Sequence, residues 1–114
     1  MIIDRATFDQ QYGDFDKEIL IDILDTFLND CPSRMAEIDK SIREKNHKSL
    51  EFSAHKLKGA ISVFTITKPY EISQEIVDKA RKKDGSGLDK LYVELKTNVE
   101  ELVNEIKEIR ESYT

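Results

Sequence analysis

His55 is the residue whose neighbours in the sequence are best suited to chemistry. It lies in a stretch, residues 46–64, whose apolar residues recur every three or four positions, as on one helix face. Turned by about 100° per residue, the stretch divides into two faces. The core face is an apolar stripe: Leu50, Ala54, Leu57, Ile61 and Phe64. The opposite face is a polar patch centred on His55: Glu51, His55, Lys58, Gly59 and Ser62.

Two features distinguish this patch from an ordinary solvated helix face. Gly59 lies inside the predicted helix, where glycine costs about 1 kcal/mol relative to alanine. Its presence indicates that something must approach the helix closely. The residues beside His55 are also small, including Ala60 and Ser62, so the imidazole should stand clear of its surroundings.

An exposed neutral imidazole is a good nucleophile near its ordinary pKa of about 6.5, and it could accept a phosphoryl group. Lys58, one turn away, could offset the charge of the phosphate oxygens. The missing side chain at Gly59 would admit a partner's active site. Because the sequence has no phosphate-binding glycine loop, the remaining machinery must come from that partner.

The segment from Ala54 to Ala60, AHKLKGA, resembles the AHxLKGx signature of histidine-containing phosphotransfer (HPt) domains. Upstream, residues 24–34 resemble the second helix of that family and its proline. Downstream, Glu71, Ile72, Glu75 and Ile76 match its usual spacing. The resemblance covers residues 8–110. It implies a four-helix bundle that relays phosphoryl groups between aspartates of response-regulator receiver domains.

The resemblance further implies that His55 is the phospho-acceptor, that Lys58 assists the phosphoryl group and that Gly59 keeps the docking surface open. Glu51 and Ser62 share this face by geometry and are predicted contacts at its rim. The sequence departs from the family's pattern at Val63, often Asn, and at Thr65, often Gly. The change at residue 65 affects the turn after the histidine helix.

Three functions are compatible with these residues. The first is a phosphorelay intermediate that accepts a phosphoryl group from a receiver or a sensor or hybrid histidine kinase. It would be no enzyme by itself and would bind no cofactor, since Mg²⁺ belongs to the partner receiver. The second is a helical interaction module that binds a receiver without transferring phosphate. The third is the phospho-acceptor domain of a larger histidine kinase, although the chain from Met1 to Thr114 favours a free-standing protein.

The rest of the sequence predicts the elements that hold this helix. Helical periodicity runs from residue 16 to the end of the sequence. Before it, Phe8, Tyr12 and Phe15 could place a short helix or a loop over one end of a helical bundle. A kink or break is expected at residues 29–31, before Pro32. Asn46 is a predicted N-cap of the helix that carries His55. A break is predicted at residues 65–68 and a turn at residues 84–87. Ser86 and Asp89 resemble a capping box at the start of the last helix. Short connections favour an all-α, up-down antiparallel four-helix bundle with an additional N-terminal helical segment.

Composition limits the other functions. The 114 residues fit one domain, residues 1–114, and 39% hydrophobic content supports a core. With 18 Lys and Arg residues against 23 Asp and Glu residues, the net charge of -5 argues against nucleic-acid and membrane-surface binding. No apolar run approaches the roughly 20 residues of a membrane span, and the N-terminal residues lack the apolar region of a signal peptide. A cytoplasmic, monomeric protein is therefore expected. A single cysteine, Cys31, excludes an internal disulfide and a Cys-based zinc site.

Overall fold

Five α-helices make up most of the protein, whose computed structural model describes residues 2–64 and 67–114. They are α1 (Arg5–Tyr12), α2 (Lys17–Arg43), α3 (His47–Ile61), α4 (Lys68–Arg81) and α5 (Leu88–Ser112). A 3₁₀ turn, Ser62–Phe64, continues α3. No strand occurs among the described residues. The predicted all-α fold with an extra N-terminal helical segment is confirmed.

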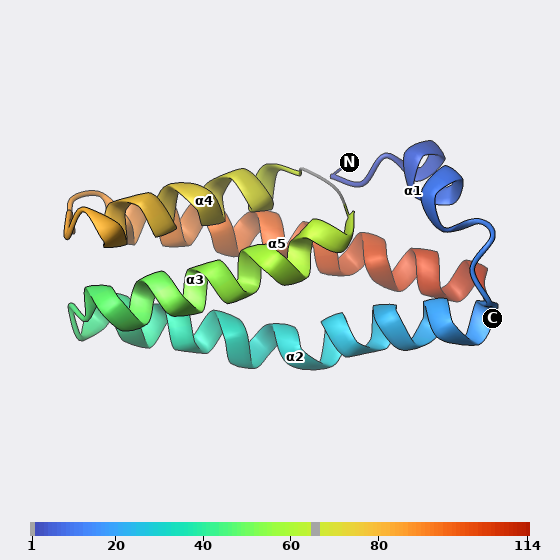
Figure 1. Cartoon of the computed structure of the whole chain (residues 1–114), viewed down its shortest axis with the longest axis horizontal. Helices are drawn as coiled ribbons and strands as arrows, with labels where there is room; N and C mark the ends of the chain where they lie inside the picture. Colours follow the sequence, from blue (N-terminus) through green and yellow to red (C-terminus); the bar gives the residue numbers. More distant parts are fainter. Residues whose placement is uncertain (1, 65–66) are drawn as a thin grey trace.

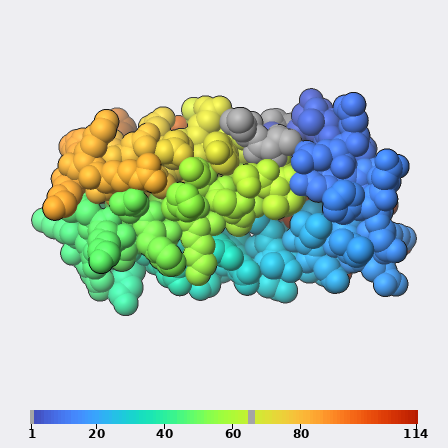
Figure 2. Space-filling view, viewed as in Figure 1, coloured from blue at the N-terminus to red at the C-terminus, as the bar shows by residue number. Residues whose placement is uncertain are grey.

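The four long helices run alternately up and down the bundle, and α1 lies across one end (Figure 1). Helix α3 packs against α2 and α4, and α5 closes the ring by packing against the same two helices. The outer face of α3 is therefore open between α2 and α4 (Figure 2). This arrangement presents the polar patch predicted around His55 to solvent.

Packing of the predicted apolar stripe holds α3 in this orientation. All five stripe residues are buried, and Ala54, Leu57 and Ile61 have no exposed surface. Their burial confirms the face assignment made from helical periodicity. Burial in α2 is less regular: Ile19 and Leu20 are adjacent apolar residues, yet Ile19 is 54% exposed and Leu20 is buried.

Of the kink or break predicted before Pro32, the break is wrong, because α2 is a single helix of 27 residues that contains Pro32. Proline removes one backbone N–H and so leaves the carbonyl one turn earlier without its helical partner. Pro32 lies on the exposed side of α2, where water can bond that carbonyl. On the inner side, Phe27, Cys31 and Met35 are buried in the core on both sides of the proline. This packing outweighs the local preference for a break.

Side-chain caps begin three of the five α-helices that the structure describes, α1, α2 and α3. The Asn46 side chain accepts a hydrogen bond from the Ser49 N–H at 3.1 Å, as predicted for an N-cap. Pro69 lies in the first turn of α4, where the backbone N–H that proline lacks would have no partner within the helix. The capping box of Ser86 and Asp89 is wrong: the N-cap residue of α5 is Gly87, which has a positive φ of 71° and no side chain to bond.

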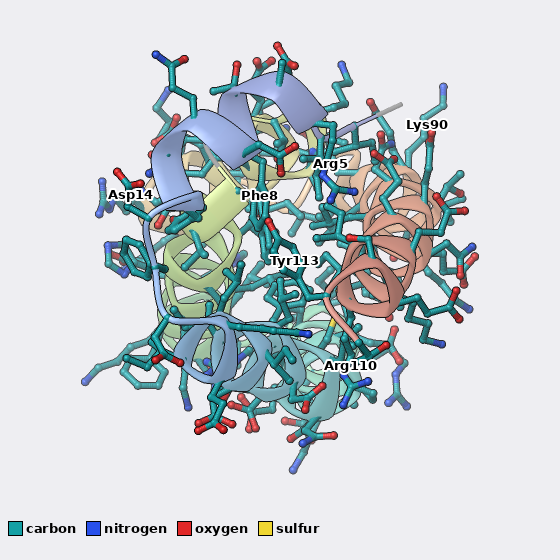
Figure 3. The ribbon with its side chains drawn as sticks, turned by 90° about the vertical axis from the view of Figure 1, so that its right-hand side faces the viewer. Arg5, Phe8, Asp14, Lys90, Arg110 and Tyr113 are labelled. Atoms are coloured by element: carbon teal, nitrogen blue, oxygen red, sulfur yellow. The ribbon has the colours of Figure 1, made fainter. Side chains whose placement is uncertain are left out.

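Helix α1 closes one end of the bundle, as expected for the aromatic N-terminal residues. Figure 3 shows α1 across this end with Phe8 directed inward. The Phe8 ring packs against Tyr12 and Phe64, with centroid distances of 4.9 and 6.2 Å. The Tyr12 hydroxyl donates to the Val63 carbonyl at 2.6 Å. This bond ties α1 to the turn after α3. Thr65, the other departure from the family pattern, lies outside the described residues.

The turn between α4 and α5 is built around Asp84. Its carboxylate accepts hydrogen bonds from the Ser86 hydroxyl at 2.6 Å and the Ser86 N–H at 3.0 Å, and it forms an ion pair with Lys79 at 3.3 Å. The Ser86 hydroxyl bond, with these other contacts, lowers the pKa of Asp84 from 3.8 to about 2. Ser86 therefore serves the turn rather than the cap of α5.

We expect carboxyl NMR to give a titration midpoint near 2 for Asp84, and Ser86→Ala to move it back toward 3.8. Since the folded-state pKa is depressed, the ionised carboxylate stabilises the fold above about pH 4, and this contribution is lost as the pH falls toward 2. An unchanged midpoint in Ser86→Ala would contradict this account of the turn.

Candidate functional site

His55 lies near the middle of the open face of α3. Its neighbours Ala54 and Leu57 point into the core, which fixes the helix so that His55 is exposed. The imidazole is therefore accessible to a macromolecule. The structure keeps His55, Lys58, Gly59, Glu51 and Ser62 on one side of α3, as the sequence predicted.

Lys58 is half-buried between α3 and α4, and two residues of α4 contact its ammonium group. Its Nζ donates to Gln74 Oε1 at 2.7 Å and lies 5.7 Å from the centre of the Tyr70 ring. Gln74 in turn donates through Nε2 to Asp78 Oδ1 at 2.8 Å. The cation is thus held on the α4 side of the patch by a defined set of contacts.

These α4 residues are part of the site that sequence reasoning missed. Tyr70, Gln74 and Asp78 are spaced four apart, so they share one face of α4. That spacing could have indicated a polar stripe. It could not have shown that the stripe faces Lys58, because this depends on how α3 and α4 pack.

Gly59 leaves open space at the surface next to His55. A Cβ built at this position would meet nothing within 4 Å, so internal packing does not require glycine here. Ser62 is exposed, and its hydroxyl donates to the Gly59 carbonyl at 2.5 Å. Packing within the described residues therefore gives no reason for glycine at this position.

On the other side of His55 lies a shallow hollow of about 410 Å³ between α3 and α4. Arg81, the last residue of α4, crosses it, and its Nε donates to Glu51 Oε2 at 3.0 Å. Phe52 is 68% exposed at its edge. Glu51, a predicted rim residue, is therefore paired within the protein. The hollow is lined by five residues: Lys48, Glu51, Phe52, His55 and Arg81.

An apolar groove between α2 and α3 begins beside Ala60, one turn beyond His55. It has a volume of about 350 Å³, and the exposed Ile19 belongs to its wall. Its other residues are mixed apolar and charged: Asp22, Ile23, Thr26, Phe27, Asp30, Arg34, Ala60 and Val63. Exposed apolar surface with a polar rim is typical of protein interaction sites.

Comparison with known proteins agrees with this geometry. The family model of the Hpt domain matches residues 22–111. The chain belongs to the Hpt domain family. Comparison with curated proteins gives no match. Among solved structures, this Hpt domain is similar to histidine-containing phosphotransfer protein B (HptB) from Pseudomonas aeruginosa PAO1, with a TM-score of 0.87. The two are 19% identical, with 98% of this chain and 96% of that chain covered, and the likeness shows a shared fold.

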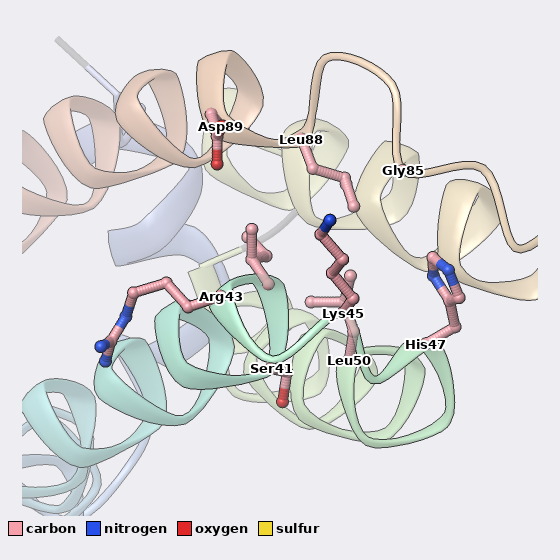
Figure 4. A pocket seen from close by; sticks show the side chains of 9 residues that line it. Ser41, Arg43, Lys45, His47, Leu50, Gly85, Leu88 and Asp89 are labelled. Carbon is pink, nitrogen blue, oxygen red and sulfur yellow. The ribbon is translucent and has the colours of Figure 1, made fainter.

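The second histidine of this Hpt domain, His47, lies far from the first. The two are eight residues apart, which separates them by about 12 Å along the helix axis. His47 begins α3 and lines a hollow of about 550 Å³ at the loop end of the bundle, directed toward the loop at Gly85 (Figure 4). The two histidines therefore cannot bind one metal ion together.

Three other kinds of feature can be assessed in the part of the Hpt domain that the structure describes: a reactive thiol, a metal site and a membrane-spanning helix. Cys31 is buried, and desolvation raises the pKa of its thiol, which disfavours the reactive thiolate. Residues 2–64 and 67–114 contain no group of three or more His, Cys, Asp or Glu residues placed to hold a metal. Within the same residues, none of the helices combines the length and apolar character needed to cross a bilayer.

Proposed function

We propose that this protein is a phosphorelay intermediate in which His55 accepts a phosphoryl group and passes it on. The donor would be a receiver-domain aspartate or a histidine kinase, and the acceptor another receiver. The observation that carries the proposal is the exposed imidazole of His55 beside the side-chain-free surface of Gly59. Membership of the Hpt domain family supports it.

The proposed reaction is a single displacement at phosphorus. The lone pair of an imidazole nitrogen attacks the phosphorus of the aspartyl phosphate, an N–P bond forms, and the P–O bond to the aspartate breaks. The carboxylate leaves with the bonding electrons, and the proton on the other imidazole nitrogen stays on the ring. The reverse displacement transfers the group to the next receiver.

The residues around His55 and the partner receiver would each supply part of what the transfer requires. Lys58 supplies positive charge, and Gln74 positions its ammonium group through the 2.7 Å hydrogen bond. The receiver supplies Mg²⁺, so no cofactor is assigned to this chain. The apolar groove between α2 and α3 would contact the receiver, with charged side chains at its edge. A monomer acting in the cytoplasm is sufficient for this role.

A transfer assay tests the proposal. Receiver domains from the same genome are phosphorylated with a small phosphodonor and mixed with the purified protein. Acid-labile, base-stable label on this chain is the expected result. If receivers bind but no label appears, the protein is instead an interaction module that needs no phosphate transfer. If label is absent, equal receiver affinity of His55→Ala and the wild type would support that second function.

Gly59 offers a prediction in which stability and function change in opposite directions. Gly59→Ala should raise the free energy of unfolding by about 0.5–1 kcal/mol, because alanine restricts the unfolded chain and favours helix. The new methyl group meets open space within the protein, so no internal clash offsets this gain. The same methyl should weaken receiver docking and slow transfer. Urea unfolding and the transfer assay measure the two effects.

Ala60→Gly provides the matched control for the stability change alone, since it changes the neighbouring helix position in the opposite sense. It should lower stability. Faster or unchanged transfer in Gly59→Ala would show that the open surface at residue 59 has no role in docking.

A further inference from the structure

The hollow between α3 and α4 has His55 among the residues that line it. Side chains on an α-helix lean toward the N-terminal end, over the turn that precedes them. The imidazole of His55 therefore leans over the turn that contains Glu51 and Phe52. His55 lines the hollow together with Arg81, whereas Lys58 does not line it. A phosphoryl group on the ring would lie at or inside this hollow.

Arg81 is available to such a group because its present partner is replaceable. Its ion pair with Glu51 joins side chains that are 53% and 40% exposed, and pairs of this kind are worth little in water. Lys58, by contrast, is half-buried and bonded to Gln74. The hollow thus contains a guanidinium group, on Arg81, that can exchange partners at little cost, and the Glu51 carboxylate that is its present partner.

A phosphoryl group is a stronger partner for Arg81 than Glu51. Phosphate monoesters, the nearest analogue of a phosphoryl group on nitrogen, carry a charge of about -1.5 to -2 at neutral pH, against -1 for a carboxylate, and present three acceptor oxygens. Guanidinium groups bind phosphate with two parallel hydrogen bonds. Lys48, which lines the hollow from α3, adds a second positive charge. Glu51 would instead repel a phosphoryl group placed beside it.

We infer that Arg81 binds the phosphoryl group on His55 and that Glu51 competes for Arg81 while His55 is unphosphorylated. This inference rests on the proposed function and adds to it an exchange of ion pairs. Phosphorylation moves Arg81 from Glu51 to the phosphoryl oxygens, and dephosphorylation restores the Glu51 pair. Glu51 therefore lowers, and Arg81 raises, the share of phosphate that resides on this protein at equilibrium with a receiver.

Two variants that remove the same ion pair distinguish this role from a structural one. Arg81→Gln should lower the equilibrium ratio of phosphorylated to free protein by about threefold to tenfold, as expected for a partly exposed charged contact. Glu51→Gln should raise that ratio by about twofold to fivefold, since the competing carboxylate is gone. A merely structural ion pair would move both variants in one direction.

Arg43→Gln is the matched control. Arg43 also pairs with a carboxylate through Nε, to Asp39 at 3.1 Å, but it is not among the residues that line the hollow. Its ratio should equal that of the wild type. A second measurement follows the Nε–Hε NMR signal of Arg81, which should shift when His55 is phosphorylated.

The outcomes separate this inference from the proposed function. A wild-type protein that never accepts label from a receiver or a small phosphodonor overturns the proposed function. A wild-type protein that accepts label, while Arg81→Gln and Glu51→Gln change the ratio in the same direction or not at all, overturns only the ion-pair exchange. An Arg81 signal that does not move on phosphorylation also overturns it.

Discussion

His55→Gln should abolish phosphorylation of this protein and leave its fold unchanged. Glutamine has no ring nitrogen that can attack phosphorus, so label transferred from a receiver should fall to background. His55 is exposed and lies opposite the buried stripe of α3, so the free energy of unfolding should change by no more than about 0.5 kcal/mol. Transfer assays and circular dichroism measure the two effects on the same preparation.

His47→Gln is the control for this prediction, because it removes the other histidine of the chain. It should retain full labelling. Label that persists in His55→Gln and disappears in His47→Gln would show that the acceptor lies at the loop end of the bundle. Loss of helicity in His55→Gln would show that the outer face of α3 has been misassigned.

Leu57→Ala should have the reverse profile, with a large loss of stability and no loss of chemistry. Leu57 is fully buried, and its truncation leaves a cavity at the centre of the bundle. Substitutions of this type cost about 2–5 kcal/mol, a large part of the roughly 5–15 kcal/mol that stabilises an ordinary domain. Urea unfolding gives the loss, and molecules that remain folded should still accept label on His55.

Lys56→Ala, the adjacent and exposed position, is the matched control and should change stability by no more than about 0.5 kcal/mol. A loss below about 1 kcal/mol in Leu57→Ala would mean that the core adjusts around the cavity. That result would contradict the tight packing inferred from complete burial.

Helical periodicity predicted the bundle well because each long helix buries one continuous stripe. The stripe of α3 was assigned residue by residue from spacing alone. Local signals were less reliable where packing opposes them. Pro32 indicated a break, yet the buried residues on both sides keep α2 continuous. Ser86 indicated a cap for α5, yet its hydroxyl bonds Asp84 in the preceding turn.

The candidate site, like the fold, could be predicted from the sequence only in part. His55, Lys58 and Gly59 lie on one helix, so their spacing predicts their common face. The partners that complete the site come from α4, at sequence separations of 16 residues for Lys58 with Gln74 and 30 residues for Glu51 with Arg81. No local pattern encodes such pairs, because they depend on how α3 and α4 pack together. The exposure of Phe52 was also not predicted, because a large apolar residue is ordinarily expected in the core.

The position of the phosphoryl group is the most direct test of the central claim. The protein is incubated with a phosphorylated receiver, digested under alkaline conditions that preserve phosphohistidine, and sequenced by mass spectrometry. We predict a phosphate on His55 and none on His47. Phosphate on His47, or no phosphate on this chain although the receiver binds it, would contradict the claim that the open face of α3 receives the phosphoryl group.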